Sequence, residues 1–204
     1  MEINERIIVA ADSLFMKYGA RSVTMDDIAR ELSVSKKTIY QYYKDKDEIV
    51  TLVSQAHIEQ EKKEFTEIYE SSNNAIEEIF KISQCIRKMV TEINPSLLYD
   101  LQKYHRRAWD LYLDYKTEFI KNSVVNNLQR GIKEGCYREE IDVEVIATFR
   151  VEQVQMAFDD KIFPRNKFNF SEVQMQLLNH FIHGLLTDKG RKLYKDYQLN
   201  NSDQ

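Results

Sequence analysis

Glycine and proline are scarce in this sequence, with five glycines and two prolines among 204 residues. Both residue types interrupt helices, and the chain is instead rich in Leu, Ile, Glu, Lys and Gln, which tolerate or favour helix. The composition therefore predicts an all-α protein. The length is sufficient for one or two compact domains with a sizeable core.

Cysteine is also rare, and the two residues present, Cys85 and Cys136, match no metal-ligand spacing. We expect both to be reduced thiols. The start of the chain, MEINERIIVAADSLF, carries acids and polar residues where a signal peptide has a basic segment followed by an apolar one. No apolar run approaches the about 20 residues that span a bilayer. These absences predict a soluble, cytoplasmic protein with no membrane partner.

Signatures of common enzymes are missing as well. The sequence has no Gly-rich phosphate loop, no nucleophile elbow and no His-Glu-x-x-His motif. His180 and His183 stand three residues apart, but no Glu-x-x-His motif accompanies them, so a metal-dependent helical enzyme is a distant third interpretation. We predict that the protein is not an enzyme and has no catalytic residue, metal site or cofactor.

Local charge is more informative than the net charge of -4, which argues against indiscriminate coating of nucleic acid. The segment SVSKKTIYQYYKDKDE, residues 33–48, contains three tyrosines and four lysines. No acid occurs from Ser35 to Lys44, although a solvated surface helix normally mixes both signs of charge. A helix that enters the DNA major groove avoids carboxylates near phosphates and presents donors and hydroxyls. The alternative is an ordinary basic amphipathic helix.

Two helices are predicted before this segment. Apolar residues recur at helical spacing from Asn4 to Lys17, and Gly19 is a suitable C-terminal cap. Thr24 and Asp27 resemble a capping box for a second helix that ends near Leu32. The SVS turn follows, and Ser35 caps a third helix.

The third helix has a buried and an exposed face. At about 100° per residue, Ile39 and Tyr43 share the face that packs on the first two helices, and Lys37 and Gln41 lie opposite. Asp45 and Glu48 then form a capping box for a fourth helix. Lys46 in its first turn, together with free helix amides, is a natural phosphate clamp.

The stretch VTMDDIARELSVSKKTIYQYYKDKDEIV closely resembles the helix-turn-helix of the TetR family of transcriptional regulators, and the likeness covers about residues 4 to 60. Its most specific part is TIYQYYKDKDEI. The sequence departs from the family pattern at Tyr43, where the family usually has Phe. If Tyr43 is buried in the same way, its hydroxyl must reach the edge of the domain to find a partner.

The resemblance implies a role for individual residues in binding a double-stranded DNA operator. It places Lys36, Lys37, Thr38 and Gln41 at base edges, where Lys suits the acceptors of guanine and Gln pairs with adenine. The residues implied to contact phosphates are Thr24, Ser35, Tyr40, Tyr42 and Lys46. For Thr24 and Ser35 the alternative is that they only cap helices.

The rest of the chain, residues 61–204, is predicted to be a larger helical domain after the DNA-binding domain of residues 1–60, with about nine to ten helices in all. The expected helices after the first three span about 46–69, 75–93, 96–112, 114–134, 139–163, 171–187 and 189–198. SSNN, Pro95, Gly135 and Pro164 separate them, and Ser96 is a candidate cap.

Apolar stripes mark the last two long helices. A single helix-turn-helix reads too few bases to be specific, so a homodimer on two half-sites is expected, and in TetR-like proteins the equivalent helices pair across the twofold axis. The alternative is that the stripes are core within one subunit. Val145 and Phe149 begin the first stripe. The predicted interface residues are Val154, Phe158, Val173, Leu177, Phe181 and Leu185.

Aromatic residues are concentrated in the middle helices, and an aromatic, methionine-lined cavity suits a flat or aliphatic ligand. Ordinary core packing is the alternative. The family resemblance places a ligand among the fifth to eighth helices. The predicted pocket residues are Met89, Tyr104, His105, Trp109, Phe149 and Gln153.

The sequence therefore indicates a ligand-responsive transcriptional regulator of the TetR type. We expect a repressor that binds a palindromic operator as a dimer and is released by an unidentified small apolar or amphipathic effector. Repression is expected only because it is the usual role of TetR-family proteins. The alternative is a helical ligand- or protein-binding module with residual DNA affinity.

Overall fold

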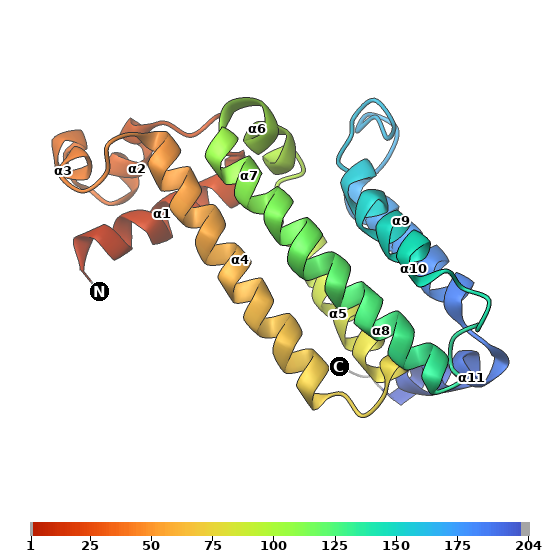
Figure 1. Cartoon of the computed structure of the whole chain (residues 1–204). Helices are drawn as coiled ribbons and strands as arrows, with labels where there is room; N and C mark the ends of the chain where they lie inside the picture. The colour runs from red at the N-terminus through yellow and green to blue at the C-terminus, as the bar shows by residue number, and fades with distance from the viewer. Residues whose placement is uncertain (1, 201–204) are drawn as a thin grey trace. The chain divides into compact units, whose positions relative to one another are not determined.

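The computed structural model describes residues 2–200, and this part of the chain is helical (Figure 1). It has no β-strand beyond one isolated antiparallel bridge between Tyr137 and Leu186. The all-α prediction is confirmed. The helices are α1 (Ile3–Tyr18), α2 (Met25–Glu31), α3 (Lys36–Tyr40), α4 (Lys46–Ser71), α5 (Ala75–Glu92), α6 (Leu97–Tyr104), α7 (Arg106–Asp114), the π-helical segment η1 (Tyr115–Ile120), α8 (Lys121–Lys133), α9 (Val143–Met156), α10 (Phe170–Leu185) and α11 (Asp188–Asn200). None of the helices within residues 2–200 has the length and apolar character needed to cross a membrane.

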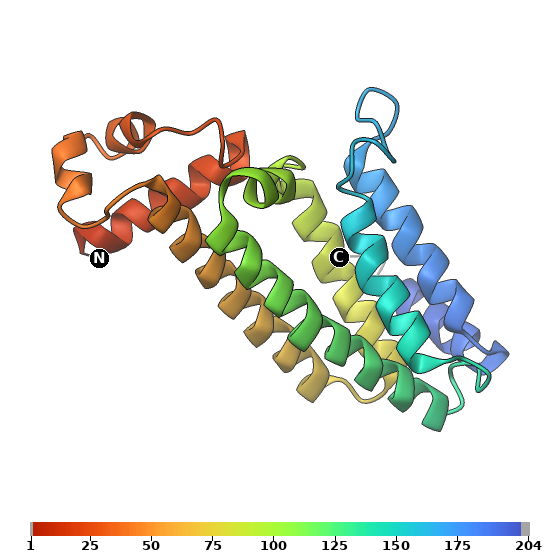
Figure 2. The same ribbon diagram turned by 45° about the horizontal axis from the view of Figure 1, so that its top comes forward.

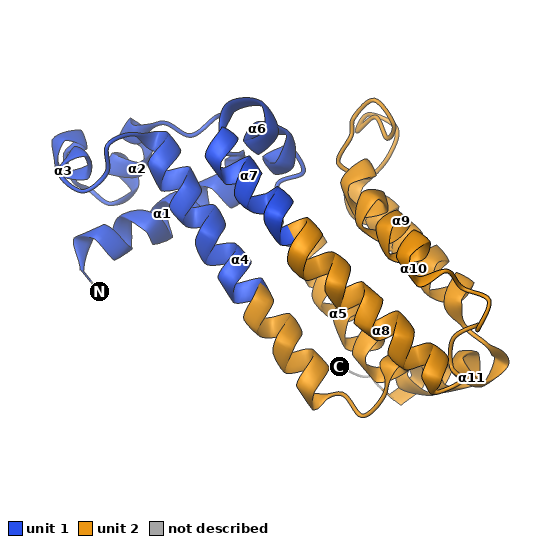
Figure 3. Ribbon diagram, viewed as in Figure 1, with its two compact units in different colours: residues 1–61, 92–115 blue, residues 62–91, 116–204 orange. Residues whose placement is uncertain are grey.

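The chain forms two compact units (Figure 3). The first contains the chain up to Glu61 together with residues 92–115. The second contains residues 62–91 and the described residues after Tyr115. The cut within α4 lies next to the boundary predicted at residue 60, but the return of residues 92–115 to the first unit was not predicted. The functional division into residues 1–60 and 61–204 stays a prediction.

The core of the first unit comes from one face of each helix. Ile7, Ala11 and Phe15 of α1 are buried at helical spacing, as their periodicity predicts. Ile28 of α2 and Ile39 of α3 are also fully buried. A polar contact supports the packing at the surface, since His57 Nε2 of α4 lies 2.6 Å from Asp12 Oδ1 of α1.

The helix expected over residues 96–112 is wrong in two respects. It is two helices, α6 and α7, with an interruption at His105, whose φ of -132° and ψ of 69° are not helical. The imidazole at this break is buried and contacts Asp47, a tertiary interaction that local periodicity does not reveal. Ser96 does not cap α6 through its side chain, because its hydroxyl bonds Asn94 Oδ1 instead.

The next helix also differs from the prediction. One α-helix was expected over residues 114–134. Instead, Tyr115–Ile120 form the π-helical segment η1, and the α-helix α8 begins only at Lys121. Residues 106–133 are helical without interruption. Buried Lys116 of η1 lies 2.8 Å from Glu152 and 2.6 Å from Gln155 Oε1, both on α9. This charged contact fastens η1 to α9.

The second unit has one apolar core, in which α9 and α10 run side by side in both views (Figures 1 and 2). Tyr137 is its largest fully buried residue. The Tyr137 hydroxyl donates to Asn127 Oδ1 at 2.9 Å and lies 3.2 Å from the Ala75 carbonyl. The other buried members of the core are Ala75, Ile76, Ile79, Phe80, Leu128, Cys136, Ala147, Leu178, Phe181, Ile182, Leu185, Leu186 and Tyr194.

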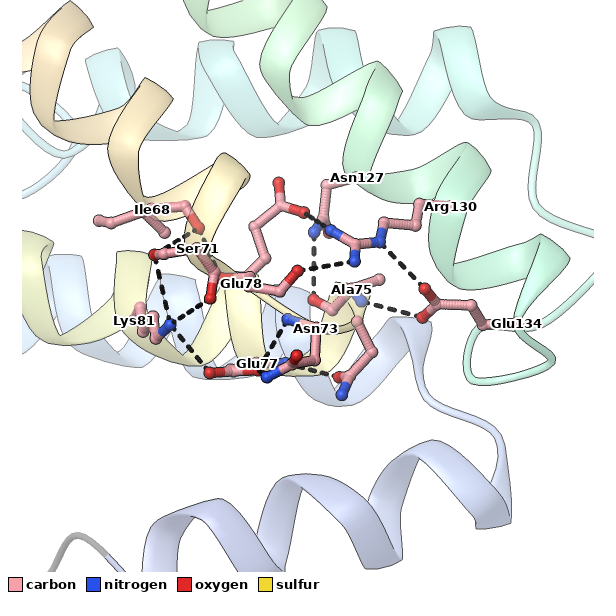
Figure 4. Close-up of polar contacts among 12 residues, drawn as sticks. Ile68, Ser71, Asn73, Ala75, Glu77, Glu78, Lys81, Asn127, Arg130 and Glu134 are labelled. Atoms are coloured by element: carbon pink, nitrogen blue, oxygen red, sulfur yellow. Dashed lines mark hydrogen bonds and ion pairs between the residues drawn. The ribbon is translucent and has the colours of Figure 1, made fainter.

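Polar groups hold the turn between α4 and α5 against α8 (Figure 4). Arg130 of α8 donates to the Ser72 carbonyl at 2.8 Å and to buried Glu78 at 3.3 Å. Glu134 accepts the amide of Ala75. Burial alone would raise the pKa of Glu77, but hydrogen bonds from Lys81 and Asn73 lower that pKa to about 2. These polar groups are bonded to one another and to the backbone, so the network stabilises the fold.

Two helical glycines provide a test of the core. A Cβ at Gly131 of α8 would collide with the ring of Tyr137, whereas a Cβ at Gly184 of α10 meets no atom. We expect Gly131→Ala to lower the free energy of unfolding by about 1–3 kcal/mol despite the better helix propensity of alanine. Gly184→Ala should be neutral or raise it by up to about 1 kcal/mol. Urea unfolding of both variants measures this, and equal effects would contradict the described packing.

Candidate nucleic-acid interface

The helix-turn-helix is set by two local caps. The Thr24 hydroxyl accepts the Asp27 amide, while Asp27 Oδ2 accepts the Thr24 amide at 2.9 Å, so the predicted capping box is confirmed. Ser35 caps α3 by accepting the Thr38 amide at 3.0 Å. Between them, Ser33 has a φ of 55°, in the left-handed region that few residues other than glycine adopt. This left-handed residue forms part of the turn between α2 and α3.

The buried face of α3 anchors it to the first helix. Ile39 is fully buried and Tyr43 is 8% exposed, as the periodicity predicts. The Tyr43 hydroxyl donates to the Asn4 carbonyl of α1 at 2.9 Å. Tyr43, which stands where the family usually has Phe, therefore makes a hydrogen bond that Phe cannot make. The expectation that its hydroxyl must find a partner is confirmed.

The opposite face of α3 is exposed and cationic. Lys37 and Gln41 are exposed, and neither side chain has a hydrogen bond or ion pair with another residue in the described range. Tyr40 and Tyr42 on either side are each 48% exposed. This surface has free donors and hydroxyls and carries no carboxylate of its own, which suits a polyanion.

Two residues predicted for this surface have partners. Lys36 Nζ lies 3.1 Å from Asp26 Oδ2 of α2, ten residues away along the chain. Thr38 is half-buried, and its hydroxyl is 2.8 Å from that of Ser35. The Lys36 ion pair is exposed and therefore weak, so a phosphate or base can replace the carboxylate at little cost.

Lys46 has a structural role that the sequence did not reveal. Its ammonium donates to three backbone carbonyls of the loop between α1 and α2, namely Ala20 at 3.0 Å, Arg21 at 3.3 Å and Val23 at 2.9 Å. An ammonium has three donors, so all of them are used. Burial lowers the pKa of Lys46. The phosphate contact predicted for this residue stays a prediction, and in this structure Lys46 holds the loop.

The first turn of α4 is capped next to this lysine. Asp45 Oδ1 accepts the Glu48 amide at 2.9 Å, as predicted. Glu48 Oε2 accepts the amide of Lys44 at 2.7 Å, one residue earlier than in a standard capping box. The backbone between α3 and α4 is therefore fixed.

Residues 92–115 also contact the helix-turn-helix within the first unit. Asp100 of α6 is 5% exposed, and its Oδ2 accepts the Arg21 amide at 2.9 Å. Asn94 donates to the Lys17 carbonyl at 3.1 Å. Sequence reasoning missed Asp100, although an acid beside Leu98 and Leu101 on the buried side of a short helix was an available signal.

The six predicted pocket residues do not form one site within either unit. Tyr104, His105 and Trp109 belong to the first unit, and the other three to the second. His105 is buried, with Nδ1 2.9 Å from Asp47 Oδ1, while its Nε2 is buried and has no partner among the described residues. Trp109 packs on Tyr112 with ring centres 5.2 Å apart. Their role in binding a ligand stays a prediction.

In the second unit, the predicted pocket residues differ in exposure. Gln153 is buried and accepts a hydrogen bond from Arg150 at 3.2 Å. Met89 is half-buried. Phe149 is 49% exposed, which fits a surface contact better than a pocket lining.

The predicted dimer residues divide between core and partial exposure. Val173, Phe181 and Leu185 are buried within the single chain, as the core alternative proposed. Val154, Phe158 and Leu177 are half-buried, and Phe158 packs on Phe170 with ring centres 4.6 Å apart. A contact of these six residues with a second copy stays a prediction.

Comparison with known proteins agrees with this geometry. Residues 7–53 match the family described as bacterial regulatory proteins, tetR family. Over 188 residues, covering 91% of this chain and 97% of the relative, the chain is 27% identical to the uncharacterized HTH-type transcriptional regulator YvaF of Bacillus subtilis.

Solved structures share the fold over most of the chain. FadR of Bacillus subtilis, solved with stearoyl-CoA, is similar with a TM-score of 0.61 and 18% identity, over 88% of this chain and 98% of that one. A regulator from Saccharomonospora viridis, solved with choline, is similar with a TM-score of 0.70 and 19% identity, over 90% and 97%. At these identities the likeness concerns the fold.

The role of Lys46 is testable by removing its donors while keeping its stem. We expect Lys46→Met to lower the free energy of unfolding by about 1–3 kcal/mol, because three carbonyls lose a charged donor. Lys44→Met is the matched control, since Lys44 is exposed and its side chain has no partner in the described range. Chemical unfolding measures both. If Lys46→Met is as stable as Lys44→Met but binds DNA more weakly, Lys46 is a phosphate ligand and not a structural residue.

Proposed function

Because the chain belongs to the TetR family of bacterial transcriptional regulators, we propose that it is a repressor that binds a palindromic operator as a homodimer and is released by a small apolar or amphipathic effector. The observation that carries the proposal is the exposed, acid-free face of α3 around Lys37 and Gln41. Its relatives are transcriptional regulators and not enzymes, and the same holds for this chain.

Specificity is assigned to α3. Lys37 and Tyr40 lie on its exposed face, and exposed Gln41 is its C-cap residue. In the major groove a lysine donates to the guanine acceptors, and a glutamine pairs with both edge groups of adenine. In this proposal Tyr42 and the helix caps Thr24 and Ser35 contact phosphates, which orient the domain without reading sequence.

Dimerisation is supported by apolar exposure on α9. Val145 is 60% exposed and Phe149 is 49% exposed, four residues apart on one face of the helix. Large apolar side chains grouped on one face often mark a contact surface. A dimer also explains how a five-residue recognition helix reads a site long enough to be specific, since two half-sites are bound together.

Release by an effector requires a link between residues 92–115 and the recognition helix. Within the first unit, the contacts of Asp100 with Arg21 and of His105 with Asp47 join α6 and the start of α7 to the loop before α2 and to the first turn of α4. An effector that prefers a conformation with these contacts altered shifts the population away from DNA by no more than its differential affinity.

Selection of bound sequences from a random duplex pool tests the function. At physiological salt, we expect the wild-type protein to enrich a palindrome. Lys37→Ala and Gln41→Ala should each relax the preference at particular positions by roughly 1–3 kcal/mol while leaving the overall fold intact.

Matched controls come from α5, where Lys88 and Gln84 are exposed. Lys88→Ala and Gln84→Ala should enrich the same palindrome as the wild-type protein. Enrichment of no sequence by the wild-type protein contradicts specific operator binding and favours a helical binding module with residual DNA affinity. Enrichment of a single half-site contradicts the dimer.

A further inference from the structure

A buried arginine in the second unit lacks an acidic partner. Arg150 of α9 is 5% exposed. Its Nη1 donates to Gln153 Oε1 at 3.2 Å, and its guanidinium carbon lies 5.4 Å from the ring centre of Phe181 on α10. Within residues 2–200, no carboxylate forms an ion pair with it.

Such an arrangement is costly in the free protein. A guanidinium carries five N–H donors, and arginine is seldom buried unless it is paired. Burial lowers the pKa of Arg150 to about 10, so the group is still charged at neutral pH. A positive charge is therefore kept inside the unit with one neutral hydrogen-bond partner and an aromatic face.

Two other cations of the second unit are paired with acids of the same unit. Arg130 of α8 contacts both Glu78 and Glu134. Lys116, as buried as Arg150, lies 2.8 Å from Glu152. Arg150 has no comparable acid, so its charge is available to an anion that the chain does not supply.

The surroundings of Arg150 indicate the rest of the ligand. Phe181 belongs to the apolar core, together with Leu178 of the same helix α10. Val145 and exposed Glu152 lie on the side of α9 opposite Arg150, so a carboxylate that approaches this outer side from a partner copy does not meet the guanidinium. A molecule that reaches Arg150 must therefore place an anionic group among apolar side chains.

We propose that Arg150 and Gln153 form the head-group site for an amphipathic organic anion, a carboxylate or phosphate on an apolar body that packs on the side of Phe181. The planar fork of arginine binds either oxyanion through two parallel hydrogen bonds. This assignment names the chemical class of the effector and rests on the proposed function for its effect on DNA. Binding of the anion itself is independent of DNA.

Binding of matched probes to the full-length protein without DNA tests the proposal. Decanoate, decyl phosphate and 1-decanol share one apolar chain and differ in the head group. Below micellar concentrations, calorimetry should show at least one of the two anions binding about tenfold or more tightly than the alcohol. The stronger of the two identifies carboxylate or phosphate as the preferred group.

Variants then locate the site. In Arg150→Met the advantage of the anion over the alcohol should fall to about onefold, and the free protein should be at least as stable as the wild type, because an unpaired buried charge has been removed. Arg191→Gln, at an exposed position of α11, should keep the full preference. Should Arg150→Met fail to fold, Arg150→Lys keeps the charge without the fork and should bind decanoate more weakly.

Three results overturn the proposal: equal binding of anions and alcohol by the wild-type protein, no binding of either anion, or a preference that survives in Arg150→Met. Failure of the proposed function is distinguishable from these, because it appears in the duplex selection without any probe. If the protein prefers anions at Arg150 but enriches no duplex, the anion site is supported and the proposed operator binding is contradicted.

Discussion

The ammonium of Lys46, held by the carbonyls of Ala20, Arg21 and Val23, fixes the loop on which the helix-turn-helix depends. Asp100 of α6 holds the same loop by accepting the Arg21 amide. At Gly19, where φ is 80°, a Cβ would lie 2.7 Å from Ser96 Oγ and 3.0 Å from Asp100 Oδ2, so no larger residue allows this approach. The loop is therefore fixed by α4 and by α6 together.

This constraint explains how so short a recognition helix is positioned. Helix α3 has five residues and few bonds of its own, and it is held by Ile39 and Tyr43 against α1 and by the turn after α2. Because the loop before α2 depends on Lys46 and Asp100, a displacement of α4 or α6 alters the support of α2 and then of α3. In the proposed function, the path from an effector to DNA passes through the backbone hydrogen bonds of this loop.

Local features of the site were predictable, and distant contacts were not. The caps at Thr24 and Ser35 join residues three apart, so the sequence contains both partners. Lys46 bonds residues more than twenty positions away, and Asp100 bonds one 79 positions away, so their roles depend on tertiary packing. The break at His105 has the same origin. Apolar stripes did not distinguish core from interface, because burial within the chain and burial by a partner produce the same periodicity.

The affinity of Asp100→Asn for the enriched duplex tests most directly whether the loop couples α6 to the proposed DNA-binding surface. Asp110→Asn, at a half-buried acid of α7 that pairs with Arg106 of the same helix, is the control. The account predicts weaker binding by Asp100→Asn with an unchanged dependence on salt, because a neutral amide holds the Arg21 N–H less well and no phosphate contact is lost. Wild-type affinity in Asp100→Asn would contradict the coupling, and a changed salt dependence would show that Asp100 acts through charge at the DNA surface.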